Sequence, residues 1–152
     1  MDMHVTAADP HAEIREEVRK LCARFPGEYW RALDARRGYP TEFVTALTEA
    51  GWLAALIPEE FGGSGLPLSA AAAILETIHA EGCNGAACHA QMYIMGTILK
   101  HGSPEQKQRY LPGIAAGTLR LQAFGVTEPT SGTDTTALRT FARREGDKDI
   151  DN

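Results

Sequence analysis

The sequence predicts a mainly α protein, in which a helical domain over residues 10–117 is followed by the first strands of an incomplete β domain over residues 118–152. Two observations predict this class. Apolar residues recur at helical spacing through the first three quarters of the chain, with capping residues between the runs. After Gly117 the pattern changes to an alternation with period two, which is typical of strands. The 152 residues are enough to bury a core without disulfides.

Charge and composition exclude several classes of protein. Fifteen Lys and Arg stand against twenty Asp and Glu, so the chain has no excess of cations for a nucleic-acid backbone. Three cysteines, an odd number, favour a reducing compartment. The first ten residues lack the basic and apolar segments of a signal peptide, so we expect a cytoplasmic protein. Polar residues interrupt the apolar stretch 83–99, and we expect no membrane span.

Helices are predicted one after another. Asp9 is placed to cap the first, with Pro10 in its first turn, and the apolar spacing continues to Phe25. Further helices are predicted over residues 29–36, 40–50, 69–80 and 86–100. The last predicted helix begins at Ser103, which is followed by proline at the first helical position and by glutamine three residues after the cap.

Two stretches between these helices have an unusual composition. Residues 57–67 hold three glycines and two prolines, which predicts an ordered loop. Residues 38–99 contain no lysine or arginine, so their helices are expected to be largely buried, in this chain or against a partner.

The residues after Gly117 predict β structure and turns. Residues 119–124 alternate between apolar and polar and predict a strand, residues 127–136 predict a turn-rich loop, and residues 137–142 predict a second strand. In residues 124–134 a strand ends in a hydroxyl, an acid, a proline and a glycine-bearing turn. Such a loop presents backbone N–H groups and hydroxyls that suit a polar ring or a phosphate, although a simple strand-to-loop transition has the same composition.

Residues 124–134 (FGVTEPTSGTD) resemble the signature of the acyl-CoA dehydrogenase family. Three further blocks resemble the family in the same order: the Gly51-Trp52 pair with residues 57–66 (IPEEFGGSGL), residues 101–112 (HGSPEQKQRYLP) and residues 140–147 (TFARREGD). The match covers residues 14–147 and is specific because four linked blocks agree.

The resemblance implies an orthogonal or up-down helical domain followed by the start of a β-barrel. It also implies an oxidoreductase of acyl-CoA metabolism, such as fatty-acid β-oxidation, that uses FAD. In that reaction a carboxylate removes the α proton of an acyl-CoA thioester while a hydride passes from the β carbon to the flavin. Electron-transfer flavoprotein is the implied partner, and the full-length form is implied to be a homo-oligomer.

Site residues carry over from the family position by position. The backbones of Phe124 and Val126 and the hydroxyl of Thr127 would contact the flavin. Thr133 matches the hydroxyl that faces the acyl-CoA substrate. The helix that carries His89 and Tyr93, with Met92 between them, corresponds to the wall of the acyl-chain pocket.

The family continues into a complete barrel and a C-terminal four-helix domain, which carries the usual catalytic glutamate. No catalytic residue is therefore predicted here, and we expect residues 1–152 to be inactive alone. Asp149 and Asp151 also stand where the family has apolar strand residues. Two alternatives stay open: a non-catalytic helical module that packs on a full-length relative, and an acyl-CoA oxidase or flavin monooxygenase of the same fold.

Structural roles are expected for several other conspicuous side chains. Cys83, Cys88 and His89 have weak spacing for a metal site, so no metal is predicted and the cysteines are expected in the core. Glu128 is expected to act as a hydrogen-bond acceptor within its loop. Solvated or packing roles are expected for the rest of this group: Glu59, Glu60, Glu76, Glu81, His79, Trp30 and Trp52.

Overall fold

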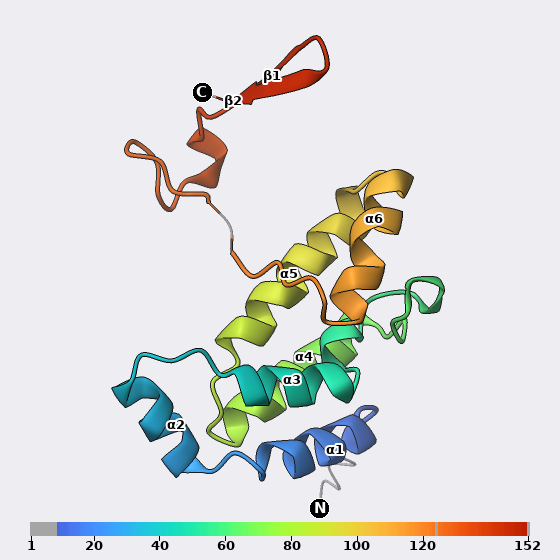
Figure 1. Cartoon of the computed structure of the whole chain (residues 1–152), viewed down its shortest axis with the longest axis vertical. Coiled ribbons are helices and arrows are strands. Elements are labelled where there is room, and N and C mark those ends of the chain that lie inside the picture. Colours follow the sequence, from blue (N-terminus) through green and yellow to red (C-terminus); the bar gives the residue numbers. More distant parts are fainter. Residues whose placement is uncertain (1–8, 124, 152) are drawn as a thin grey trace, which may run out of the picture.

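The computed structural model describes residues 9–123 and 125–151, and six helices make up about half of that part of the chain (Figure 1). All six were predicted from the sequence. Their bounds are α1 Ala12–Cys22, α2 Gly27–Ala35, α3 Thr41–Glu49, α4 Leu68–Ala80, α5 Ala86–His101 and α6 Pro104–Ala115. The remaining elements are three single turns of 3-10 helix and one hairpin: η1 Trp52–Ala54, η2 Glu59–Phe61, η3 Thr135–Ala137, β1 Ala142–Glu145 and β2 Lys148–Asp151.

The ends of two helices show how local sequence sets their bounds. The Ser103 hydroxyl accepts a hydrogen bond from the Gln106 amide at 3.2 Å, and the Gln106 side chain accepts one from the Ser103 amide at 2.8 Å. This capping box confirms the predicted start of α6. The prediction for α1 was wrong in detail, because His11 is the N-cap residue. Asp9 instead accepts from the His11 amide at 2.9 Å and pairs with Arg15 at 2.7 Å.

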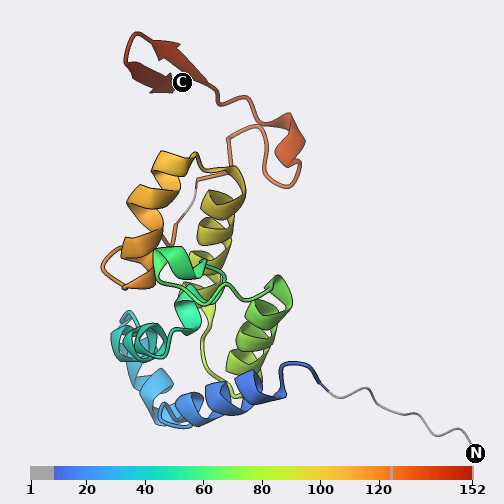
Figure 2. The same ribbon diagram turned by 90° about the vertical axis from the view of Figure 1, so that its right-hand side faces the viewer.

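The core lies among the helices and extends into η1, where Leu53 and Ala54 are buried. Helix α1 packs against α4, as Figure 2 shows in the lower half of the molecule. Arg15 reaches across this contact from α1 to the Glu76 carboxylate, 2.6 Å away. The segment without cations is buried only in part, but it supplies most of the large side chains with almost no exposed surface: Phe43, Val44, Leu47, Leu53, Ile57, Ile74, Ile78, Gln91 and Met95.

The loop over residues 57–67 is ordered by its own backbone hydrogen bonds, as predicted. The Gly65 amide donates to the Ile57 carbonyl at 2.8 Å, and the Leu66 amide donates to the Ala55 carbonyl at 2.7 Å. Gly63 passes so close to this backbone that a Cβ atom would lie 2.0 Å from the Ile57 oxygen. The loop therefore folds back over the end of η1 as a fixed part of the helical domain.

Both strand predictions after Gly117 need correction. Residues 119–123 form no strand, and residue 124 lies outside the described residues. Leu119 and Leu121 pack on the helical core instead, so the period-two pattern marks a segment with one face against helices. The second strand was predicted over residues 137–142 but begins only at Ala142, and residue 137 is instead the end of η3.

Strands β1 and β2 form an antiparallel hairpin in which Ala142 pairs with Asp151 and Glu145 pairs with Lys148. Gly146 has a φ of 67° in the tight turn between them, a conformation that favours glycine. Strand β2 thus forms although Asp149 and Asp151 stand where the resemblance predicts apolar strand residues. Figure 2 shows the hairpin at the far end of the molecule from α1. Within the described residues, no helix combines the length and apolarity needed to cross a membrane.

Candidate functional site: a groove along helix α5

An apolar groove of about 690 Å³ runs along one face of α5 and is bordered by the segment that follows α6. It brings together three residues that the sequence singled out, His89, Tyr93 and Val126. The α5 residues in its lining recur every three or four positions, so they form one stripe on the helix. The complete lining is Ala86, His89, Ala90, Tyr93, Ile94, Thr97, Ile98 and Val126.

Three residues of the groove lining carry polar side-chain groups: His89, Tyr93 and Thr97. The rings of His89 and Tyr93 meet edge to face, with centroids 5.2 Å apart. His89 is exposed and Tyr93 is half-buried. The Thr97 hydroxyl donates to the Tyr93 carbonyl at 2.9 Å, which leaves its methyl group for the groove. A volume and an apolar lining of this kind suit a ligand with an aliphatic chain or a flat ring.

The segment from Gly125 to Thr127 has free hydrogen-bonding capacity. Within the described residues, the peptide groups of these three positions form no backbone hydrogen bond. The Thr127 side chain is exposed and Val126 is half-buried against the groove. Unpaired peptide groups beside an apolar surface can bind the polar edge of a ligand. Phe124, the remaining predicted flavin contact, lies outside the described residues.

The loop after Thr127 is organised around Glu128, as the sequence predicted. Its carboxylate accepts hydrogen bonds from the amides of Arg139 at 2.9 Å and Thr140 at 2.6 Å, and from the Thr140 hydroxyl. The Thr140 hydroxyl, followed by these amides, holds the pKa of Glu128 below its usual value. Glu128 is therefore an ionised structural acceptor. Thr133 is exposed in the same loop and, like Thr127, is not part of the groove lining.

All three cysteines are buried, which confirms the core role expected for Cys83 and Cys88. Burial raises the pKa of Cys22 and of Cys88 to about 12, and it also raises the pKa of Cys83. In the part of the chain that the structure describes, no three His, Cys, Asp or Glu side chains are grouped so that they could hold a metal ion.

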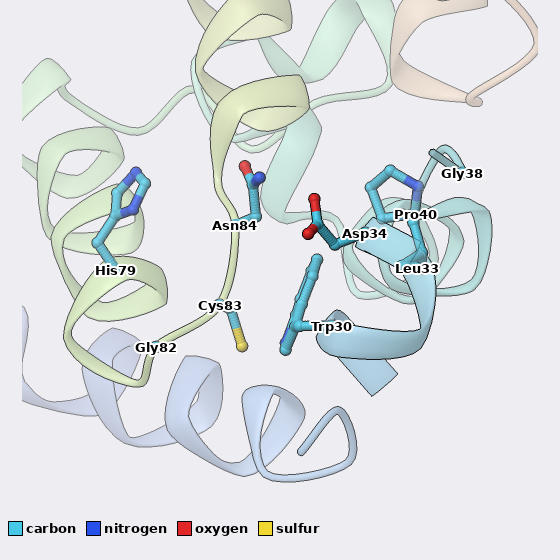
Figure 3. Close-up of a pocket in the computed structure, with 9 residues that line it drawn as sticks. All are labelled: Trp30, Leu33, Asp34, Gly38, Pro40, His79, Gly82, Cys83 and Asn84. Atoms are coloured by element: carbon cyan, nitrogen blue, oxygen red, sulfur yellow. The ribbon is translucent and has the colours of Figure 1, made fainter. Parts of the chain in front are cut away.

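A second, more polar cleft of about 550 Å³ was not predicted from the sequence. Figure 3 shows Trp30, Asp34 and Asn84 on one side of the connection that runs through Cys83, with His79 on the other side. The Trp30 indole N–H already donates to the Phe25 carbonyl at 3.0 Å, so this side chain acts as a packing anchor. The lining comes from two separated segments, residues 30–40 and 79–84, without a shared motif, and only the tertiary structure could reveal it.

Comparison with known proteins adds to this geometry. Residues 8–118, well over half of the chain, match the sequence profile of the family described as acyl-CoA dehydrogenase, N-terminal domain. The chain belongs to the acyl-CoA dehydrogenase family. It is 31% identical over 146 residues to the acyl-CoA dehydrogenase FadE12 of Mycobacterium tuberculosis, a match that covers 95% of this chain and 37% of that protein.

Two solved structures show that the fold of this acyl-CoA dehydrogenase family member is shared. A glutaryl-coenzyme A dehydrogenase in complex with glutaryl-CoA superposes with a TM-score of 0.79 at 29% identity, covering 100% of this chain and 39% of that one. A structure of the electron transferring flavoprotein of Acidaminococcus fermentans gives a TM-score of 0.79 at 29% identity, with 100% and 40% covered. The present chain thus spans less than half the length of the proteins it resembles.

Proposed function

We propose that the α5 groove and the segment 125–134 form one wall of the flavin and acyl-thioester site of an enzyme that dehydrogenates acyl-CoA thioesters between the α and β carbons. The observation that carries the proposal is the meeting of His89, Tyr93 and Val126 in one apolar groove. The family's pattern assigns His89 and Tyr93 to the acyl chain and Val126 to the flavin. Val126 is more than 30 residues away from the other two in sequence, so only the fold brings them together.

The residues present fit a flavin. The groove lies within the roughly 300–1,000 Å³ that is typical of cofactor pockets. Gly125, Val126 and Thr127, whose peptide groups form no backbone hydrogen bond among the described residues, would offer donors and acceptors to the edge of an isoalloxazine ring, together with the exposed Thr127 hydroxyl. Val126 and Thr127, with Phe124, would hold FAD, which when bound supplies the hydride acceptor for the reaction.

The acyl chain is the second ligand that we assign to this wall. His89 and Tyr93 would lie beside it along α5, and burial of its methylene groups against the apolar stripe would provide much of the affinity. Thr133 would face the CoA thioester. None of the groove residues is a carboxylate, so the proposal assigns them binding and orientation and assigns no base. We therefore expect residues 1–152 to bind these ligands without turnover.

The organisation of the whole enzyme follows from the same proposal. Residues 10–117 would be the helical domain and residues 118–152 the start of the middle β domain. Electron-transfer flavoprotein would reoxidise the flavin, which is in keeping with the match to a structure of such a system. We further propose a homo-oligomer in the cytoplasm.

Equilibrium binding tests the proposal. Flavin fluorescence would measure binding of FAD to the 152-residue chain, and calorimetry would compare octanoyl-CoA with free CoA. Octanoyl-CoA should bind more tightly, since only its acyl chain can bury apolar surface in the groove. Thr97→Arg fills the exposed end of the groove and should weaken binding of FAD and octanoyl-CoA about tenfold, a loss of about 1.4 kcal/mol.

Thr45→Arg is the matched control, because Thr45 is exposed in the middle of α3 and lies outside the groove. Equal affinities of the two variants, or equal affinities for octanoyl-CoA and CoA, would contradict the proposed use of the groove.

A further inference from the structure

The segment 118–123 connects α6 to the proposed flavin-facing residues and is held on the helical domain at several points. The amides of Thr118 and Leu119 both donate to the Gly113 carbonyl, at 3.0 and 2.9 Å. Leu119 and Leu121 pack on the helical core. The segment pairs with no strand in the described part of the chain, so these contacts, with those of its polar side chains, fix its course.

Gln122 joins three parts of the chain through its amide. It accepts a hydrogen bond from the Tyr39 hydroxyl at 2.7 Å, and it donates one to the side-chain oxygen of Gln91 at 3.3 Å. Tyr39 comes from the connection between α2 and α3, while Gln91 lies in α5. One side chain thus links segments that are 83 and 31 residues away in sequence.

Gln91 is a buried polar residue whose side-chain oxygen accepts the hydrogen bond from Gln122. Its side chain has no exposed surface, and among the described residues its amide nitrogen finds no partner. An apolar residue at this position would avoid the cost of an unsatisfied buried amide. Unlike an apolar residue, Gln91 supplies the oxygen that accepts the hydrogen bond from the Gln122 side chain.

Helix α5 therefore supports the site on two faces. Ala90, Tyr93 and Ile94 line the groove, whereas Gln91, between them in sequence, is buried. Gln122 precedes Val126, which borders the groove, by only four residues. The position of the Gln122 backbone on the helical domain consequently limits where Val126 and Thr127 can lie.

We propose that Gln122 is a positioning residue, which through Tyr39 and Gln91 fixes segment 118–123 on the helical domain and so sets the place of Gly125–Thr127 beside the groove. The inference rests on the proposed function for its consequence, which is flavin binding. The two hydrogen bonds of Gln122, to Tyr39 and to Gln91, form what we call the tether, and they need no ligand.

Three variants and a control test the tether in the 152-residue chain. Gln122→Leu keeps the size of the side chain and removes both hydrogen bonds, and Tyr39→Phe removes only one. Gln122→Glu is the conservative rescue, because its carboxylate accepts from Tyr39 and from the Gln91 amide after that amide rotates by half a turn. Gln108→Leu makes the same substitution at an exposed position of α6.

Hydrogen exchange of the Thr118 and Leu119 amides reports opening of the segment. Exchange should be about tenfold faster in Gln122→Leu, as expected for the loss of two ordinary hydrogen bonds. It should be faster by a smaller factor in Tyr39→Phe, and close to the parent rate in Gln122→Glu and Gln108→Leu. NMR shifts that FAD induces at the amides of residues 125–127 should shrink in Gln122→Leu and return in Gln122→Glu.

The outcomes separate the two proposals. If Gln122→Leu exchanges as slowly as Gln108→Leu, the role of Gln122 is overturned, whatever FAD does. If FAD induces the same shifts in Gln122→Leu as in the parent chain, the tether exists but does not position the site, and the inference fails. If FAD induces no shifts in the parent chain, the proposed function fails, and the exchange rates alone decide whether Gln122 holds the segment.

Discussion

Gly63 offers the sharpest test of how the loop between η1 and α4 is built. A Cβ atom at this position would lie 2.0 Å from the Ile57 oxygen and 2.6 Å from the Ala54 oxygen. To reach the 3.4 Å of ordinary contact, the Ile57 oxygen would have to move by about 1.4 Å and the Ala54 oxygen by about 0.8 Å. Each accepts a hydrogen bond from the loop, from Gly65 at 2.8 Å and from Ser64 at 3.4 Å, which the movement would break.

The expected cost of Gly63→Ala follows from these contacts. Two lost backbone hydrogen bonds and the strain of overpacking together give about 3–5 kcal/mol of destabilisation. For a chain of this size that corresponds to a fall in melting temperature of roughly 10 °C or more. Thermal and urea unfolding followed by circular dichroism would measure it.

Gly96→Ala is the control with the opposite sign. A Cβ atom on Gly96 meets nothing within 4 Å, and the residue lies inside α5, where alanine is more favourable than glycine. This variant should be more stable than the parent by about 0.5–1 kcal/mol. A Gly63→Ala chain that unfolds together with the parent would refute the described packing of the loop.

Three further predictions concern a cap, a carboxylate and the thiols. Ser103→Ala removes the cap of α6 and should lower the free energy of unfolding by about 1 kcal/mol, measured by urea denaturation; an unchanged midpoint would count against the capping box. The pKa of Glu128 is lowered in the folded chain. Ionised Glu128 therefore contributes fully to loop stability above the pKa of the unfolded chain, about 4.5, and this contribution is lost as the pH falls through the pKa of the folded chain. In an NMR titration the Thr140 amide should therefore shift with a midpoint below 4.5, and a midpoint at or above that value would be inconsistent with the hydrogen bonds. At pH 8 a thiol reagent should label none of Cys22, Cys83 and Cys88 until denaturant is added. Rapid labelling of the native chain would contradict the burial of these thiols.

The helices could be predicted because their signals are local. Ser103 and Gln106 are three residues apart and cap each other without help from the rest of the fold. The strand over residues 119–124 was mistaken because alternation reports only that Leu119 and Leu121 share a face. What covers that face, here the helical core, is a tertiary fact that the pattern does not contain.

The groove was predictable only through the family resemblance. Nothing in the spacing of His89, Tyr93 and Val126 indicates that they meet, since the contact depends on how the segment after α6 turns back along α5. The resemblance selected the three residues, and the fold brings them together. Thr127 and Thr133, which came from the same resemblance, lie outside the groove lining, so their roles stay predictions.

The most direct measurement of the central claim is an NMR titration of the isotopically labelled 152-residue chain with FAD and then with octanoyl-CoA. We predict amide shifts concentrated in residues 86–98 for both ligands, with shifts at residues 125–127 for FAD and near Thr133 for the acyl-CoA. Shifts confined to α1, α2 and α3, or none at ligand concentrations of about 1 mM, where even binding of about −4 kcal/mol would be visible, would contradict this prediction.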